Sequence, residues 1–336
     1  MTKRRLNQQQ LRRIGNQQRR HNKRADDPIT PGEQALGLIV CHYGQQLDVE
    51  PLEGSKQGEL LRCHQRSNLP PLVTGDKVIW QPDGEHTGVI VAQQPRHTVM
   101  SRPNNRGQLR PIAANVDVVV VVIAPVPEPF GNLIDRYLVA IEEQQLRALI
   151  LLNKADLVPA DGDDKLSQLL ERYRKIGYET LTLSSHSGQG IGQLKERLLS
   201  RTAVFVGQSG VGKSSLINSL RGSDTDEFMA AVGDLSVGHE KGTHTTTATR
   251  LYHLPGSGDL IDSPGIREFG LWHIEPEELA HGFIEFRPFL GQCRFRDCRH
   301  TEEPGCALRA AAANGEIDES RLASYRQILL SLDSER

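Results

Sequence analysis

The segment GQSGVGKSSL, residues 207–216, constrains the fold more than any other part of the sequence, because it has the pattern G-x-x-x-x-G-K-[ST]. It follows the apolar run AVFV and precedes SSLINSL, so a strand is expected before the loop and a helix after it. Glycines let the backbone N–H groups of such a loop turn inward around phosphate oxygens. Lys213 would reach the β- and γ-phosphates, and the Ser214 hydroxyl would bind Mg²⁺. The segment predicts a nucleoside triphosphate site.

Strand and helix patterns alternate around this loop from about residue 115 onward. Apolar runs predict strands at residues 116–124, 148–152, 179–185, 202–206, 247–253 and 259–262. Segments between them predict helices at residues 133–145, 164–177 and 190–200. Continuous apolar strands that alternate with helices are typical of a parallel sheet covered by helices, so we expect an α/β domain.

The tetrapeptide NKAD, residues 153–156, stands at the end of the apolar run ALILL. The Asp156 carboxylate could accept from two adjacent N–H donors on the guanine edge, which adenine does not present together. Lys154 could lie along the plane of the base, and Asn153 could tie this loop to the phosphate loop. The pattern favours guanine over adenine.

A second base loop is predicted at LSSHSGQG, residues 183–190, which also stands at a strand end. Its hydroxyl and backbone N–H groups could meet the oxygen of the base through Ser184 and Ser185. A plain serine turn before a helix explains this segment equally well.

The sequence DSPG, residues 262–265, ends another apolar strand. There the Asp262 carboxylate could hold a water bound to Mg²⁺, and the Gly265 N–H could meet the γ-phosphate. Between the phosphate loop and DSPG lies KGTHTTT, residues 241–247, in which one hydroxyl could bind the metal when the γ-phosphate is present: Thr245 or Thr246. The spacing does not choose between them.

These strand-end motifs match a guanine nucleotide site, but NKAD precedes the phosphate loop by about fifty residues instead of following it. The ends of a compact domain lie close together, so joining them and cutting elsewhere keeps the site intact. The order therefore predicts a circular permutation. It also makes the loop that senses the γ-phosphate continuous with whatever follows residue 270, so hydrolysis is expected to move or release that C-terminal part.

A residue that orients the attacking water is not obvious, because Ile266 follows DSPG where GTPases often carry a glutamine. His244 in the threonine-rich loop is the first candidate, and Arg267 is the second. His244 could equally be a solvated loop residue.

Residues 35–102 have a different pattern, with five short strand-like runs separated by Gly, Pro and Asp. This predicts a small β-barrel of the OB type, a class that often binds oligonucleotides. Cys41 and Cys63 fall within these runs and are expected to be small core residues.

The other three cysteines cluster with a histidine in CRFRDCRHTEEPGC, and the candidate ligands are Cys293, Cys298, His300 and Cys306. Three thiolates and one imidazole fit a closed tetrahedral Zn²⁺ site with a structural role, since four protein ligands leave no open position. Four nearby arginines suggest contact with RNA or simply a solvated surface: Arg287, Arg294, Arg296 and Arg299.

The charge distribution separates the first residues from the rest. Residues 1–25 carry nine Lys or Arg and no acid, whereas the whole chain of 336 residues has a net charge of −2. We expect a disordered tail, with a role either in binding nucleic acid or in solubility.

Five cysteines and the lack of a long apolar segment favour a cytoplasmic protein without a membrane span.

Taken together, NKAD, GQSGVGKSS, KGTHTTT, DSPGIREFG and the Cys-x4-Cys-x-His-x5-Cys cluster, in this order behind a β-rich segment, resemble the RsgA (YjeQ) family of small-ribosomal-subunit biogenesis GTPases over about residues 35–330. The resemblance implies slow GTP hydrolysis that the 30S subunit stimulates, contact with 16S rRNA, a role in late 30S maturation, bound Zn²⁺, and Mg²⁺ with GTP. It also lends support to His244, because the family is thought to use the histidine of this loop.

We thus expect four regions: a basic tail at 1–34, an OB-fold RNA-binding domain at 35–102, a circularly permuted GTPase domain at 103–270 and a helical zinc domain at 271–336. We also expect a monomer. The complete set of expected nucleotide and Mg²⁺ contacts is Asn153, Lys154, Ala155, Asp156, Ser184, Ser185, Gly207, Gln208, Ser209, Gly210, Val211, Gly212, Lys213, Ser214, Ser215, Thr245, Thr246, Asp262 and Gly265. The alternative is an RNA scaffold that binds GTP with hardly any turnover.

Overall fold

The computed structural model describes residues 34–43, 46–54, 56–104, 108–158, 164–221, 249–262, 274 and 276–334. Residues 1–33 of the predicted basic tail and the residues His244, Thr245, Thr246, Gly265 and Arg267 lie outside these ranges. Among the described residues, no helix has both the length and the apolar character that crossing a bilayer requires.

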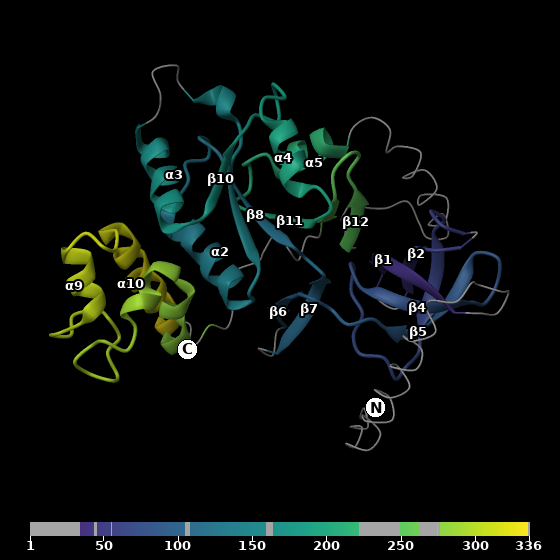
Figure 1. Ribbon diagram of the computed structural model, residues 1–336, viewed down its shortest axis with the longest axis horizontal. Helices are drawn as coiled ribbons and strands as arrows, with labels where there is room; N and C mark the ends of the chain where they lie inside the picture. The colour runs from purple at the N-terminus through teal and green to yellow at the C-terminus, as the bar shows by residue number, and fades with distance from the viewer. Residues whose placement is uncertain are drawn as a thin grey trace.

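A five-stranded barrel forms the N-terminal part of the described chain (Figure 1). Its strands are β1 (Ala35–Tyr43), β2 (Gln46–Pro51), β3 (Leu61–Gln65), β4 (Lys77–Pro82) and β5 (Thr87–Gln93). They pair in the order β1-β2-β3-β5-β4, and a β1–β4 pairing closes the barrel. Cys63 is fully buried in the barrel core and Cys41 is 2 % exposed, as the sequence predicts for both.

A hairpin that the sequence patterns do not predict connects the barrel to the next domain. Its strands, β6 (Val99–Pro103) and β7 (Leu109–Ala114), form a separate two-stranded sheet (Figure 1). Pro111 lies within β7, and a proline inside an apolar run argues against a strand when only the sequence is read. The predicted domain boundary at residue 102/103 falls within β6.

The α/β domain is built on five parallel strands. They are β8 (Val118–Ile123), β9 (Arg147–Leu152), β10 (Glu179–Thr182), β11 (Thr202–Val206) and β13 (Asp259–Asp262), and β12 (Thr249–His253) adds an antiparallel sixth strand. The spatial order is β10-β9-β8-β11-β13-β12. All six residues of β8 are buried, because helices cover both faces of this central strand.

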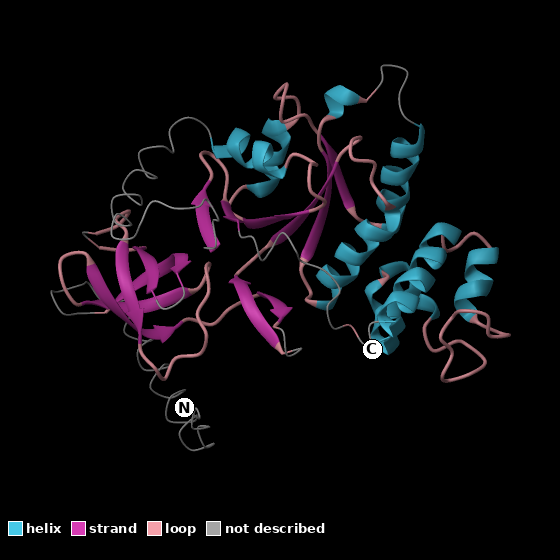
Figure 2. Cartoon of the chain, turned by 180° about the vertical axis from the view of Figure 1, so that it is seen from behind, coloured by secondary structure: helices cyan, strands magenta, loops and turns pink. Residues whose placement is uncertain are grey.

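Two helices pack on each face of this sheet. One face of β8, with Val119 and Val121, packs against α2 (Gly131–Glu143) and α3 (Asp164–Ile176). The other face, with Val118 and Val120, packs against α4 (Ile191–Leu198) and α5 (Lys213–Arg221). Figure 2 shows this layered arrangement from behind.

The barrel and the α/β domain share one continuous sheet of eleven strands. The connection is the antiparallel pairing of β1 with β12, in which Cys41 lies opposite Arg250 and His42 lies opposite Thr249. Thr74 adds a hydrogen bond of 3.1 Å from its hydroxyl to the Thr249 carbonyl. The sequence patterns predict both domains but give no sign of this joint.

The C-terminal domain is helical, as predicted. It contains α8 (Pro276–Leu279), two 3₁₀ turns (Ala280–Gly282 and Ile284–Phe289), α9 (Ala307–Ala313) and α10 (Glu319–Ser334). From the sequence this region lacks a large apolar core of its own. The structure supplies the reason it folds, because Phe283, Phe286 and Tyr325 belong to the same buried cluster as α2 and α3.

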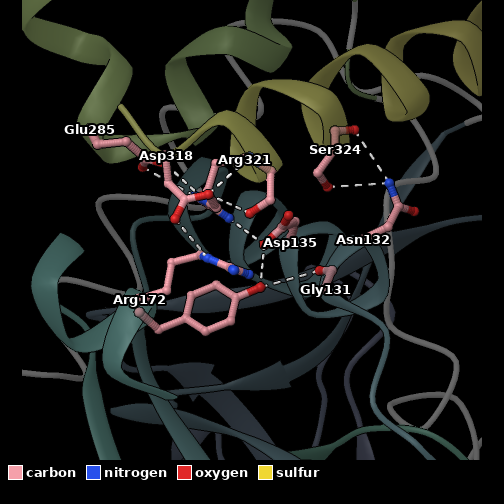
Figure 3. A network of polar contacts seen from close by, with 10 residues as sticks. Gly131, Asn132, Asp135, Arg172, Glu285, Asp318, Arg321 and Ser324 are labelled. Carbon is pink, nitrogen blue, oxygen red and sulfur yellow. Dashed lines mark hydrogen bonds and ion pairs between the residues drawn. The ribbon is translucent and has the colours of Figure 1, made fainter. Parts of the chain in front are cut away.

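A buried polar clasp fixes this domain to α2 (Figure 3). Arg321 of α10 is 1 % exposed and forms ion pairs with Asp135 of α2 and with Glu285. Tyr173 of α3 donates a hydrogen bond of 2.6 Å to Asp135. We call Asp135, Tyr173, Glu285 and Arg321 the clasp. Because Arg321 has two carboxylate partners, its charge is compensated despite its burial.

Candidate guanine nucleotide site and metal centre

The predicted nucleotide-binding loops meet at one edge of the parallel sheet. NKAD follows β9, the loop at 183–190 follows β10, the phosphate loop follows β11, and Asp262 is the last residue of β13. Because β9, β10, β11 and β13 all run parallel through β8, their carboxyl ends lie at the same edge. Ligands of open α/β sheets bind at this edge.

The phosphate loop has the backbone shape that its glycines permit. Gly207, Gly210 and Gly212 have positive φ values of 139°, 85° and 93°. A Cβ atom on Gly207 would lie 2.3 Å from the Val122 carbonyl oxygen, so only glycine fits there. Lys213, the first residue of α5, donates hydrogen bonds of 2.6 and 2.7 Å to carbonyl oxygens within the loop. Its ammonium group is therefore held over the turn that would enclose phosphate.

Asn153 joins its own loop to the phosphate loop and to the loop at 183–190. The sequence predicts the first of these two contacts but not the second. The side chain is fully buried, and its Nδ2 donates to the Val211 carbonyl at 3.0 Å. Its Oδ1 accepts from the Ser185 backbone N–H, also at 3.0 Å. A Cβ atom on Gly212 would lie 2.5 Å from Asn153 Nδ2, so the glycine permits this close approach. The base loop and the phosphate loop thus form one packed unit.

Lys154 lies across the same junction. Its backbone has a left-handed φ of 58°, and its Nζ donates to the carbonyls of Val126 at 2.8 Å and Gly210 at 2.7 Å. This places the aliphatic part of the side chain between the phosphate loop and the loop after β8. The contact with Val126 has no signal in the sequence, because residues 125–130 match no motif.

Asp156 is exposed at the base end of the site. The Ser184 hydroxyl donates a hydrogen bond to its Oδ1, and this bond is the main cause that lowers the pKa of Asp156 below its usual value. Ser184 is fully buried and its hydroxyl also accepts from the Ser187 N–H at 3.0 Å. In this structure Ser184 orients the carboxylate, a role that the sequence did not suggest.

The remaining predicted contacts differ in how exposed they are, and some of them lie outside the described residues. Ser209, Gly210, Ser214 and Ser215 are exposed at the edge of the sheet, and Ala155 and Gln208 are half-buried beside them. Asp262 is half-buried next to β11, where Ile261 lies opposite Val204. The threonine-rich loop and the residues after Asp262 lie outside the described part, so their predicted roles stay predictions.

The four predicted metal ligands come together in the C-terminal domain. The Nδ1 atom of His300 lies 3.4 Å from Cys293 Sγ, 3.6 Å from Cys298 Sγ and 3.4 Å from Cys306 Sγ. All four ligand atoms lie within 4.8 Å of one another. Zinc bonds to sulfur and nitrogen at tetrahedral angles would separate the two kinds of ligand atom by about 3.5 Å. The donor set and its spacing fit Zn²⁺.

The metal centre is attached to α10 through the residues around it. The Tyr325 hydroxyl donates 3.0 Å to the Arg299 carbonyl, and Arg326 donates to the His300 carbonyl at 3.4 Å. Two of the four arginines that suggest RNA contact have carboxylate partners: Arg287 pairs with Glu142 of α2, and Arg299 pairs with Asp333. The first pair links the C-terminal domain to α2, and the second links the segment of the metal ligands to α10.

Comparison with known proteins settles the family. The model of the family described as RsgA GTPase matches residues 93–272. The chain is 52 % identical to the small ribosomal subunit biogenesis GTPase RsgA of Pseudomonas putida, over 99 % of this chain and 98 % of the relative. The chain belongs to the RsgA GTPase family. The RsgA of Hahella chejuensis is 51 % identical over 100 % of this chain and 98 % of its own length.

Two solved structures agree with this membership of the RsgA family. The crystal structure of YjeQ from Thermotoga maritima is similar with a TM-score of 0.71 and 32 % identity, covering 90 % of this chain and 100 % of that one. The structure of YloQ, described as a circularly permuted GTPase, gives a TM-score of 0.70 at 26 % identity and covers 92 % and 99 %. The predicted family resemblance and fold class, including the permutation, are confirmed.

Proposed function

We propose that this chain hydrolyses GTP to GDP and phosphate and acts in the biogenesis of the small ribosomal subunit. The observation that carries the proposal is the packing of NKAD against the phosphate loop through Asn153 and Gly212. That contact supports one nucleotide site made from motifs in permuted order. Relatives at 52 % identity bear the name of small ribosomal subunit biogenesis GTPase, which supports the biological role.

In the proposed site, each end of the nucleotide has its own set of residues. The Asp156 carboxylate accepts hydrogen bonds from guanine, and its lowered pKa favours the ionised form that can do so. Lys154 covers the base, and Asn153 holds the two loops in register. Backbone N–H groups of residues 207–215 and the Lys213 ammonium group bind the phosphates.

Magnesium and the attacking water complete the proposed reaction. The Ser214 hydroxyl and either Thr245 or Thr246 would hold Mg²⁺, with Asp262 acting through a bound water. Mg²⁺ would neutralise charge on the β- and γ-phosphates. His244 is proposed to orient the water, since it stands in the loop G-T-H-T-T-T and the side chain of Ile266 cannot form a hydrogen bond.

We further propose that the partner is the 30S subunit with its 16S rRNA, that the chain acts late in maturation, and that nucleotide state controls attachment. The barrel supports this, because OB barrels commonly bind oligonucleotides. The C-terminal domain follows the DSPG segment in the chain, which supports a mechanical link between the γ-phosphate and that domain. We expect a cytoplasmic monomer; sedimentation of the purified chain tests its oligomeric state.

A hydrolysis assay separates this function from a GTP-binding scaffold. Turnover is measured with and without purified small subunits, for the unmodified chain and for His244→Ala. Stimulated turnover that falls at least about a hundredfold in the variant supports the proposal, since general-base or positioning groups contribute about 10² to 10⁴. Binding of GTP with no turnover in either condition supports the scaffold.

Base choice is tested separately with Asp156→Asn, which cannot accept two hydrogen bonds from guanine. We expect GTP affinity to fall and discrimination against ATP and xanthosine triphosphate to weaken by two or more orders of magnitude. Asp83→Asn, an exposed position in a turn of the barrel, is the matched control. If the unmodified chain binds ATP and GTP equally, the assignment of the base loop is wrong.

A further inference from the structure

A row of polar side chains crosses five neighbouring strands, from the nucleotide edge of the α/β sheet to the barrel. Asp262 lies opposite Arg250, Arg250 opposite Cys41, Cys41 opposite Asp48, and Asp48 opposite Arg62, in β13, β12, β1, β2 and β3. All four pairings are antiparallel, and residues directly opposite in antiparallel strands point to the same face. We call these five residues the cross-strand row.

The barrel half of the row is joined by direct contacts. Arg62 donates a hydrogen bond of 2.6 Å from Nε to Asp48 Oδ1. Arg250 donates from Nη2 to the Tyr43 hydroxyl at 2.9 Å, and the Arg62 guanidinium lies 5.3 Å from the centre of the Tyr43 ring. Two arginines, one from each domain, therefore meet on the same tyrosine.

Asp48 is shared electrostatically between these two arginines. Its side chain is 2 % exposed, and this burial raises the pKa of Asp48, whereas the charges of Arg62 and Arg250 lower it. A buried carboxylate needs compensation, and losing one positive partner is costly. If Arg62 turns away, the field of Asp48 acts mainly on Arg250.

Arg62 is the member of the row that an RNA partner can reach. Its side chain is 21 % exposed on β3, where His64 is also exposed, and exposed Arg66 directly follows the strand. Strands 2 and 3 form the usual oligonucleotide face of an OB barrel. A phosphate bound to Arg62 would compete directly with Asp48 for its guanidinium.

We propose that the cross-strand row transmits occupation of the barrel by RNA to Asp262, with Arg250 as the residue that couples the barrel to the strand of Asp262. The proposal rests on the proposed GTPase function and on the role of Asp262 in holding Mg²⁺. RNA phosphate draws Arg62 from Asp48, Asp48 then attracts Arg250, and Arg250 shifts relative to Asp262 on the neighbouring strand. The two positions of Arg250 are the two states that such coupling requires.

Arg250→Met tests the proposal in the full chain, because methionine keeps much of the side-chain volume and removes the charge. We expect GTP hydrolysis without small subunits to stay within about twofold of the unmodified chain, and stimulation by small subunits to fall at least tenfold. Binding of small subunits in the presence of a GTP analogue, followed by co-sedimentation, should not change. Arg250→Lys should restore part of the stimulation.

Two further variants separate coupling from folding. Asp48→Asn should also lose stimulation, and the double variant Asp48→Asn/Arg250→Met should lose no more than the worse single variant, because the two residues act in one route. Arg197→Met removes an arginine that pairs with Glu179 at the far end of the parallel sheet, and should keep full stimulation. Thermal unfolding of each variant identifies any that fail to fold.

The outcomes distinguish this inference from the proposed function. If small subunits stimulate the unmodified chain and folded Arg250→Met equally, the row is not the route and the GTPase function stands. Additive losses in the double variant would likewise overturn a single route. If small subunits do not stimulate the unmodified chain, the proposed function fails and the inference fails with it. If Arg250→Met does not fold, the same measurements on Arg250→Lys and Asp48→Asn decide.

Discussion

The barrel and the C-terminal domain are attached to the nucleotide domain in two different ways. The barrel is joined through main-chain pairing, because β1 and β12 make a single sheet out of two domains. The C-terminal domain is joined through side chains, with Arg321 of α10 enclosed between Asp135 and Glu285. Main-chain pairing fixes the register and the direction of the two strands that it joins. Contacts between side chains fix neither, and they can separate together when the charged groups find other partners.

The difference suits the proposed roles of the two domains. A rigid joint transmits small shifts, and the cross-strand row runs through it from Arg62 to Asp262. A joint made of side chains is compatible with the movement of the C-terminal domain that we propose after hydrolysis.

Removal of zinc should affect only the side-chain joint. Structural zinc sites supply about 10 kcal/mol or more of apparent folding free energy. Chelation, or Cys306→Ser, should therefore expose the segment around residues 293–306 to protease and loosen α10, since Tyr325 and Arg326 bond to carbonyls of that segment. Hydrogen exchange of β1 and β12 should not change. Equal loosening of both joints would contradict the comparison.

Removal of one clasp charge should have the next largest effect. Arg321→Ala leaves Asp135 and Glu285 without their common partner, and breaking a buried pair costs about 3–5 kcal/mol. The free energy of unfolding in urea measures this loss. Arg172→Ala is the matched control, because Arg172 pairs with the exposed Asp318 at 2.9 Å. Such exposed pairs contribute at most about 1 kcal/mol. Similar losses in both variants would mean that the clasp does not hold the domain.

His253 makes the barrel joint sensitive to high pH. The hydrogen bonds to Asp259 and then to Glu50 of the barrel raise the pKa of His253 from 6.5 to about 10. Because the folded-state pKa is raised, the stabilisation is fully present below about pH 6.5 and disappears as the pH rises through about 10.

His253→Gln should therefore destabilise the chain by about 1 kcal/mol at neutral pH, a value reduced for an imidazole that is 45 % exposed. The difference between the variant and the unmodified chain should vanish above pH 10. Unfolding curves at pH 6, 8 and 10.5 measure it. A difference that stays constant with pH would show that His253 contributes through packing alone.

Thr74→Val should have the smallest effect. It removes one hydrogen bond of 3.1 Å to the Thr249 carbonyl, for which we expect the low end of the usual contribution, about 0.5 kcal/mol, and it leaves the strand pairings of the sheet intact. Faster hydrogen exchange of β12 amides is the expected result. Thr98→Val, which removes a similar bond to the Val116 carbonyl outside the joint, is the control and should leave β12 unchanged.

The sequence predicts the parts of this molecule better than their contacts. Motifs such as NKAD and GQSGVGKS are local, and each carries its chemistry wherever it lies in the chain, so their convergence follows once the strands are parallel. The pattern of ligands from Cys293 to Cys306 is equally local, and the structure brings all four together.

The joints depend on residues whose partners are far away in the sequence. In the sequence Arg321 looks like one more surface arginine of a helix, and only the approach of α2, nearly two hundred residues earlier, makes it buried. Arg250 and Cys41 likewise occur in ordinary strand patterns. Pairing between distant strands has no local signal, which is why the β1–β12 joint and the cross-strand row could not be predicted.

The position of β8 has a consequence for the nascent chain. This strand is the first of the α/β domain to leave the ribosome, yet it ends up in the middle of the sheet, between β9 and β11. One flank can be covered as soon as β9 emerges, but the other stays open until β11 is made, about fifty residues later. The half of the sheet that carries the proposed base loops is thus assembled before the phosphate loop has been made. A newly made molecule therefore cannot use bound nucleotide to guide its early folding. It becomes able to bind nucleotide only near the end of its own synthesis.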